Sequence, residues 1–290
     1  MSLAVQLGLL LALATAFASV VGFLYKHRGA VESPAVELRR PIRTSLALFR
    51  SQWYVLGIVI ATASWGLHVA ALSLAPISLV QSVIAGGLVL LTVTAHRLFA
   101  HEVTLREWIG VGLAALGLAF LAATIGGTGD SAHSSYELAR LWPWVGALAA
   151  AAFVVAFASR GSLHAGVMLG ASAGLFWAAS DTSIKALSDH LGDGVAAVLL
   201  SPLAAVVALA SAAGLVVSAR SLQVGKAVPV IAVTSVAANL FTIAAGRVVF
   251  GEPMPDTAVG VVARMLAFAL VISAAALTPA PVRAAPDPAG

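Results

Sequence analysis

Nine long apolar runs, separated by short polar segments, are the feature that most constrains how this chain can fold. A helix that spans the hydrocarbon core of a bilayer needs about 20 mostly apolar residues. The runs occupy residues 2–24, 53–75, 77–96, 108–125, 144–159, 164–187, 195–218, 227–250 and 257–278. Only 10% of the residues are charged, against about 25% in soluble domains. We therefore expect an all-α, polytopic membrane helical bundle with about nine transmembrane helices.

The distribution of lysine and arginine predicts how the bundle is oriented. With the N-terminus outside, twelve of the 16 basic residues fall in cytoplasmic segments and three fall outside, as the positive-inside rule requires. We expect a multi-pass protein of the cell membrane, surrounded by lipid, with its C-terminus in the cytoplasm. The basic residues are scattered between apolar spans, so they indicate no nucleic-acid-binding face.

An internal repeat organises the spans. Shifting the chain by 150 residues aligns the third and fourth spans with the eighth and ninth, and places Arg97 on Arg247 and Glu102 on Glu252. Copies that lie five spans apart are inverted in the membrane, and inverted repeats are typical of alternating-access transporters. The expected divisions are an N-terminal repeat (1–126, four spans), an external loop (127–143), a C-terminal repeat (144–278, five spans) and a disordered cytoplasmic tail (279–290).

Short motifs near the repeats carry a resemblance to a known family. The first copy contains Ala71-Leu72-Ser73-Leu74-Ala75-Pro76, His101-Glu102 and Trp108-Ile109-Gly110, and the second contains Pro229, Gly251-Glu252 and Gly260. This pattern resembles the repeat of the drug/metabolite transporter (EamA-like) superfamily. The nine-span layout and the turn Tyr25-Lys26-His27-Arg28-Gly29 resemble the NIPA-like magnesium transporter branch. The resemblance implies a transporter rather than an enzyme, with magnesium or another divalent cation as substrate.

Polar and ionisable side chains inside the spans predict the solute pathway, because such groups are costly in hydrocarbon and typically functional. His68, Gln81, Asp181 and Arg264 lie at a similar depth, roughly 8–10 Å from the external ends at 1.5 Å per residue. Asp181 is the only carboxylate that we expect inside the membrane, so we expect it to pair with Arg264, Lys185 or both. The structural alternatives are an i,i+4 pair between Asp181 and Lys185 and an Arg264 side chain that snorkels to the headgroups.

The sixth span has a stripe of small residues that predicts close helix packing. Gly166, Gly170 and Gly174 follow at intervals of four, a spacing that lets a neighbouring backbone approach. Three further residues are candidates for the pathway, with helix packing as their alternative role: Trp177, Trp65 and Asn239.

The sequence shows no catalytic constellation and implies no cofactor. Gly170–Gly174 matches the nucleophile-elbow pattern, but that motif requires a strand-turn-helix context and here lies within a membrane helix. The seven histidines have no HExxH-type spacing, and the chain has no cysteine.

The substrate stays open at the level of sequence. Magnesium prefers oxygen ligands, usually one or two carboxylates with retained waters. Asp181 supplies one, while Lys185 and Arg264 would repel a nearby cation, so the metal ligands stay unassigned. The interpretations are a transporter of magnesium or another divalent cation, a proton-coupled exporter of an organic metabolite or drug, and a membrane scaffold subunit that transports nothing. The oligomeric state is also open, with a homodimer as one arrangement.

Overall fold

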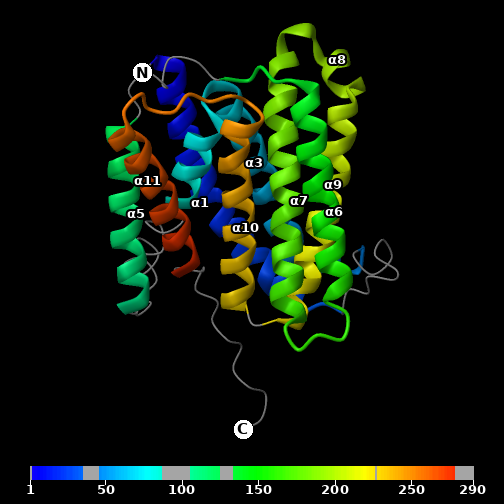
Figure 1. Cartoon of the computed structure of the whole chain (residues 1–290). Helices are drawn as coiled ribbons and strands as arrows, with labels where there is room; N and C mark the ends of the chain where they lie inside the picture. The colour runs from blue at the N-terminus through cyan, green and yellow to red at the C-terminus, as the bar shows by residue number, and fades with distance from the viewer. Residues whose placement is uncertain (1, 35–45, 87–104, 125–132, 226, 278–290) are drawn as a thin grey trace.

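The computed structural model describes residues 2–34, 46–86, 105–124, 133–225 and 227–277, and within these ranges the chain is helical and has no strand. The helices lie side by side in one bundle (Figure 1). They are α1 (Leu3–Val31), α3 (Gln52–Leu74), α5 (Leu105–Ala123), α6 (Leu138–Ala158), α7 (Ala165–Leu187), α8 (Val195–Leu200), α9 (Pro202–Val224), α10 (Ala227–Val248) and α11 (Ala258–Leu277), with a 3₁₀ segment, η1, at Ser188–Asp193. Residues Ile77–Gly86 are also helical.

The helices confirm the expected fold class, an all-α membrane bundle. By length and composition, α3, α6 and α9 can each cross a membrane, and shorter apolar helices occur at Leu3–Ser19, Ile77–Gly86, Val233–Val248 and Ala258–Ala274. The total of nine spans stays a prediction, because the third expected span, 77–96, is described only as far as Gly86.

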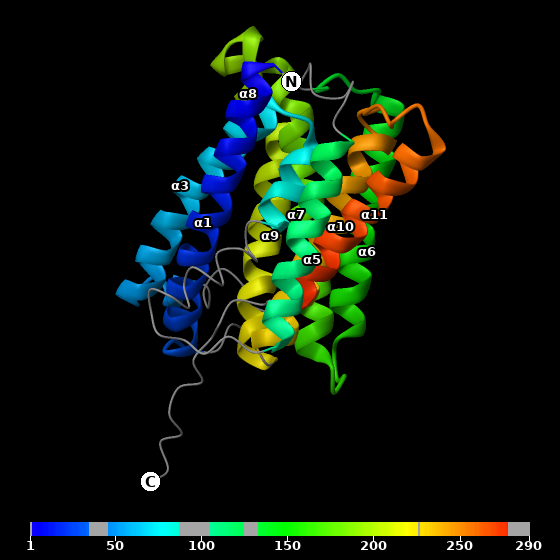
Figure 2. The same cartoon turned by 90° about the vertical axis from the view of Figure 1, so that its left-hand side faces the viewer.

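The packing of the bundle divides it into groups of neighbouring helices. α1 packs along α3, α5 packs along α11, and α7 packs along α6, α9 and α10. Figure 2 shows α1 and α3 together at one side of the bundle. Sixteen of the 23 residues of α7 are buried, so the polar residues of this helix lie inside the protein.

Contacts at the two ends of α7 show that α3 and α9 run in opposite directions. Gly166, in the first turn of α7, lies against Gly225 at the end of α9, where a Cβ on Gly166 would be 2.3 Å from the Gly225 Cα. In the last turn of α7, the Nζ of Lys185 donates to the carbonyls of Leu72 and Ala75 at the end of α3.

The glycines of α7 allow close packing against a second neighbour, α10. A Cβ on Gly170 would lie 3.0 Å from the Oγ1 of Thr234, and one on Gly174 would lie 2.5 Å from the Thr234 carbonyl oxygen. The Thr234 hydroxyl donates to the Gly170 carbonyl at 3.0 Å. Side chains at these two positions would therefore separate α7 from α10.

α1 and α6 extend beyond the spans that the sequence predicts. α1 continues past residue 24 to Val31, where Arg28 lies over the ring of Trp53, 4.0 Å from its centroid. α6 begins at Leu138, inside the segment expected to be a loop, and contains Pro143. Proline there removes one intrahelical hydrogen bond, but it lies near the start of the helix.

The seventh expected span, 195–218, is divided. Its first part is α8, and α9 begins only at Pro202 after Ser201. The Ser201 hydroxyl accepts a hydrogen bond from the Leu203 N–H, and proline is favoured in the first turn of a helix, where its missing N–H costs nothing. Because the apolar run continues across the break between α8 and α9, hydropathy alone did not predict the break.

Candidate functional site

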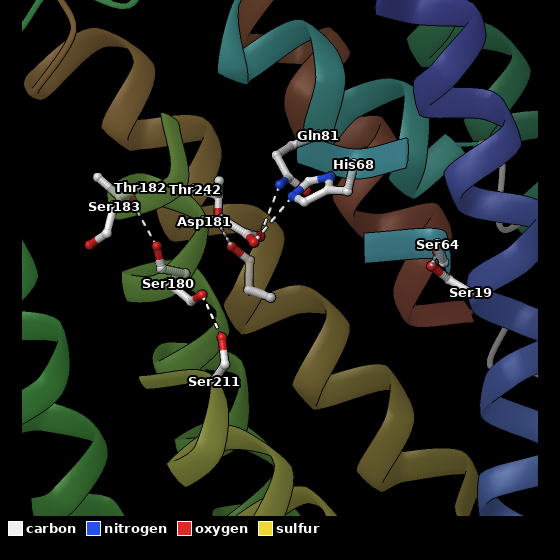
Figure 3. A network of polar contacts seen from close by, with 12 residues as sticks. Ser19, Ser64, His68, Gln81, Ser180, Asp181, Thr182, Ser183, Ser211 and Thr242 are labelled. Atoms are coloured by element: carbon white, nitrogen blue, oxygen red, sulfur yellow. Dashed lines mark hydrogen bonds and ion pairs between the residues drawn. The ribbon is translucent and has the colours of Figure 1, made fainter. Parts of the chain in front are cut away.

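Three helical segments bring their polar side chains together around Asp181 (Figure 3). The Nε2 of His68, on α3, lies 3.1 Å from the Oδ1 of Asp181, on α7. The amide Nε2 of Gln81, in the helical segment 77–86, donates to Oδ2 at 3.0 Å. The side chains of His68 and Asp181 are 10% and 17% exposed, and Gln81 is buried. These three residues are called the Asp181 cluster.

Hydroxyl groups surround the Asp181 cluster. Figure 3 shows Thr242 of α10 beside Asp181, with Ser180, Thr182 and Ser183 on the adjacent positions of α7. The Ser180 hydroxyl is hydrogen bonded to that of Ser211 on α9 at 2.9 Å, and Thr182 and Ser183 donate to backbone carbonyls of their own helix. The cluster therefore lies in a polar region at the junction of several helices.

One atom of the cluster has no hydrogen-bond partner in the described structure. The Nδ1 of His68 is buried and unpaired. With Asp181 ionised, the Nε2 of His68 must carry the hydrogen that reaches Oδ1, and Nδ1 of the neutral ring then presents a lone pair. A buried polar atom without a partner is costly, so a ligand that supplies a donor would bind favourably there.

Lys185 lies one turn above Asp181 and caps the end of α3. It is fully buried, and its Nζ donates to the Leu72 carbonyl at 2.6 Å and to the Ala75 carbonyl at 2.9 Å. The last carbonyls of a helix lack intrahelical partners and carry partial negative charge. Because Pro76 follows directly, the ammonium group satisfies carbonyls that the chain itself leaves open.

Glu252 caps the next helix on the other side of Pro76. Its Oε1 accepts a hydrogen bond from the backbone N–H of Ser78 at 3.3 Å, and Glu252 is only 6% exposed. A carboxylate is favourable at a helix N-terminus. Burial raises the pKa of the Glu252 carboxyl above its ordinary range, while the hydrogen bonds from Ser78 and the charge of Lys185 oppose that shift.

Two glycines allow Glu252 to reach this position. Gly251 has a φ of 60°, which glycine adopts at little cost, and the turn directs Glu252 back into the bundle. A Cβ on Gly246 would lie 2.4 Å from the Glu252 Oε2. The sequence analysis assigned Glu252 only to the repeat motif, and its buried position depends on these two glycines.

The ion pair expected of Asp181 with Arg264 or Lys185 stays a prediction, and the contacts described for these three side chains are with other groups. Arg264 is buried and donates to the carbonyl and hydroxyl of Thr124 and to the Pro253 carbonyl. Lys185 binds the end of α3, and Asp181 binds His68 and Gln81. Glu252, rather than Asp181, is the carboxylate whose charge acts on both Lys185 and Arg264.

The remaining predicted pathway residues lie elsewhere. Trp65 is 47% exposed on the surface of the bundle, and its place in the pathway stays a prediction. Trp177 packs against Gly214 of α9, and the Asn239 amide donates to Ser235 within α10. Glu102 lies outside the described residues.

Metal-binding groups and cavities are the remaining features that bear on function. Within the described ranges, no group of three or more His, Asp or Glu side chains is placed to hold a metal ion. A cavity of about 590 Å³ opens between α6 and α10, apart from the Asp181 cluster. Its lining residues are Arg140, Pro143, Trp144, Ala147, Arg247, Val248 and Gly251.

Comparison with known proteins gives one distant relative. The chain is 22% identical over 276 residues to a probable magnesium transporter, NIPA9, of Arabidopsis thaliana, and the alignment covers 90% of this chain and 78% of the relative. No family model matches the chain, and no solved structure matches it. The similarity extends over nearly the whole bundle, so this is a membrane protein distantly related to a transporter.

Proposed function

We propose that the protein is a secondary transporter of the drug/metabolite transporter type that moves a small cation across the cell membrane past the Asp181 cluster. The observation that carries this proposal is a carboxylate, only 17% exposed, that lies on α7 and is contacted by α3 and the segment 77–86, at the junction between the two halves of the chain. The name of the distant relative makes Mg²⁺ the first substrate to test.

The charges around the Asp181 cluster favour a cation. Lys185 and Arg264, which would repel one, are engaged with backbone carbonyls. Glu252 is the carboxylate whose charge acts on both of them. Mg²⁺ usually retains several waters and binds through one or two carboxylates. One carboxylate with amide and hydroxyl groups nearby suits a hydrated ion.

The mechanism that we propose is alternating access by two inverted repeats. In such transporters the substrate site lies between the repeats and one repeat rocks against the other. The opposite directions of α3 and α9 support the inversion. His68 and Gln81 come from the first proposed repeat and Asp181 from the second, so movement of one repeat would change the contacts of the carboxylate.

Flux into reconstituted liposomes tests this function. With a Mg²⁺-sensitive dye inside the vesicles, the wild type should load Mg²⁺ down its gradient, and Asp181→Asn should abolish loading because an amide cannot ionise. Asp256→Asn changes an exposed carboxylate and is the matched control, with flux equal to wild type. Wild-type flux no faster than in empty vesicles, or full flux in Asp181→Asn, would contradict the proposal.

A protonated organic amine is the second candidate substrate. The unpaired Nδ1 of His68 favours a ligand that carries hydrogen-bond donors, and an ammonium group supplies both donors and positive charge. Radiolabelled methylammonium, tested in the same vesicles, distinguishes this substrate class from Mg²⁺.

A further inference from the structure

Two arginines lie in the wall of the cavity between α6 and α10. Arg140 belongs to the first turn of α6 and Arg247 to the last turn of α10. The lining positions of α6 are 140, 143, 144 and 147, and their spacing of three or four residues places them on one face of the helix. The cavity volume of about 590 Å³ falls in the range of sites that hold small organic ligands.

Both guanidinium groups have hydrogen-bond donors beyond those that their described contacts use. The Nε of Arg140 lies 3.0 Å from the Oε2 of Glu137, and the Nη1 of Arg247 donates to the Glu252 carbonyl at 3.3 Å. A guanidinium carries five N–H donors, and each of these contacts uses one. The side chains of Arg140 and Glu137 are 54% and 67% exposed, and an exposed ion pair contributes little to stability. Arg140 can therefore also bind a ligand that offers acceptor oxygens.

The wall of the cavity also contains a polar group without a partner. Trp144 lines the cavity and packs against Phe241 of α10. Its indole Nε1 is buried and has no hydrogen-bond partner in the part of the chain that the structure describes. The indole nitrogen is a donor only, and the described residues that line the cavity include no acidic side chain. Two positive charges and donor groups in one wall favour an anionic ligand.

The cavity suits a phosphate group that carries an organic part. Arginine binds phosphate through two parallel hydrogen bonds. Pro143, Ala147 and Val248 form apolar wall that a bare inorganic anion would not contact favourably. Because α6 is long and apolar enough to cross a membrane, its first turns lie near one membrane surface. Basic pockets between membrane helices bind the phosphates of lipid headgroups at such positions.

We propose that the cavity between α6 and α10 is a binding site for a phosphate group, supplied by the headgroup of an anionic lipid or by a soluble organic phosphate. Arg140 and Arg247 bind the phosphate oxygens from two helices, and Trp144 with the apolar wall contacts the attached organic group. The site lies apart from the Asp181 cluster, so this inference does not depend on the transport function. Its occupant would touch Gly251, in the turn that directs Glu252 into the bundle.

Two binding measurements on the purified full-length protein in neutral detergent distinguish the two sources. In the first, the protein is incubated with equal amounts of phosphatidylglycerol and zwitterionic phosphatidylcholine, and native mass spectrometry counts the lipids that stay bound. Preferential retention of one phosphatidylglycerol would identify a lipid headgroup. In the second, calorimetry follows glycerol 3-phosphate, and binding of one molecule per protein would identify a soluble phosphate. We expect at least one of the two probes to bind.

The arginine variants test which groups hold the phosphate. Arg140→Gln and Arg247→Gln each remove one charged donor group, and each should weaken binding of that probe about tenfold or more. Arg160→Gln makes the same change at an exposed position beyond the other end of α6, and it should bind like the wild type.

A variant without a change in charge tests whether the phosphate enters the cavity. Ala147→Phe narrows the cavity from its α6 wall and should abolish binding. Ala150→Phe makes the same change at an exposed position of α6 outside the lining, and it should bind like the wild type. Thermal unfolding of each variant without ligand should match that of the wild type, because the changed positions are exposed.

Three results would overturn the proposal. The first is that the wild type binds neither phosphatidylglycerol in preference to phosphatidylcholine nor glycerol 3-phosphate. The second is that Arg160→Gln loses as much affinity as Arg140→Gln and Arg247→Gln, which would mean attraction to net positive charge rather than to a site. The third is unchanged binding in Ala147→Phe, which would place the phosphate outside the cavity.

Discussion

The helix pair α1–α3 and the helix pair α7–α9 have corresponding helix ends and close contacts but different polar side chains. α3 and α9 each have 23 residues, each begins after a serine N-cap (Ser51, Ser201), and each ends at an extended residue (Ala75, Gly225) whose N–H bonds the carbonyl four residues earlier. Each pair of caps lies 150 residues apart, the same shift that aligns the later spans. The shift therefore continues into helices that share no clear motif.

The contacts within the two pairs also correspond. Gly8 of α1 lies against Ala75, and Gly166 of α7 lies against Gly225. In each contact, a glycine in the first turns of one helix lies against the C-cap residue of the neighbouring helix. Gly8 and Gly166 are 158 residues apart. α1 and α7 therefore correspond at a shift of 158 residues, whereas α3 and α9 correspond at a shift of 150.

A second contact occurs at corresponding positions in the two pairs, but the side chains that make it differ. A Cβ on Gly22 would lie 3.1 Å from the backbone nitrogen of Ala61, so α1 and α3 approach closely there. At the positions 158 and 150 residues later, Ser180 and Ser211 share a hydrogen bond of 2.9 Å. The backbones keep one arrangement, and the side chains differ.

The two halves also differ at the Asp181 cluster. His68 and Gln81 contact Asp181 in one half, whereas the residues 150 positions later are Ser218 and Ile231. The second half therefore has no equivalent pair of nitrogen groups. The cation site that we propose therefore combines two nitrogen groups from the first half with a carboxylate from the second.

The largest expected effect comes from the end of α3, which Lys185 caps. Lys185→Met keeps the length of the side chain but leaves two buried carbonyls open and removes the positive charge near Glu252. Breaking one partner of a buried charged arrangement costs about 3–5 kcal/mol. Reversible unfolding in mixed micelles should show this loss.

Arg160→Met is the control for Lys185→Met. Arg160 is an exposed cation just after α6, and surface changes of this kind usually alter stability by less than about 0.5 kcal/mol. Equal stability of the two variants would show that the ammonium group is not needed at this end of α3.

Gln81→Ile tests whether the amide group of the first half is needed. The change places at position 81 the residue type that occurs 150 positions later, at Ile231. The change removes the amide that donates to Asp181. A hydrogen bond to a charged group contributes about 1.5–3 kcal/mol, so we expect a loss of about 2 kcal/mol in unfolding and slower Mg²⁺ flux. Gln52→Ile, at the exposed start of α3, should change neither. Wild-type flux in Gln81→Ile would mean that Asp181 needs no amide partner.

The helices were largely predictable from the sequence, and the partners in the site only partly. α7, α10 and α11 begin and end within two residues of the expected spans, because long apolar runs define membrane helices well. Counting depth placed His68, Gln81 and Asp181 in one layer, but depth gives no direction around the bundle axis. It therefore could not separate Arg264 from them.

The position of Glu252 depends on a different kind of information. Hydropathy places Glu252 in the connection between two spans, and the turn at Gly251, with its positive φ, lets its side chain be buried in the bundle. The breaks beside Pro76 and Pro202 are likewise set by capping groups, of which Lys185 and Glu252 come from distant parts of the chain. Such long-range caps leave little pattern in the local sequence.

The smallest expected effect tests the shared frame itself. The Ser51 hydroxyl accepts a hydrogen bond from the Tyr54 N–H at 3.4 Å, and the Ser201 hydroxyl accepts one from the Leu203 N–H at 3.2 Å. Replacing an N-cap serine by alanine costs about 1 kcal/mol, so Ser51→Ala and Ser201→Ala should each lose about that amount in the same unfolding measurement. Thr62→Ala, on the exposed surface of α3, should lose almost nothing, since alanine favours the helix interior. If the two cap variants differ by more than about 1 kcal/mol, the starts of α3 and α9 are not energetically equivalent. The correspondence of the two pairs would then be limited to their geometry.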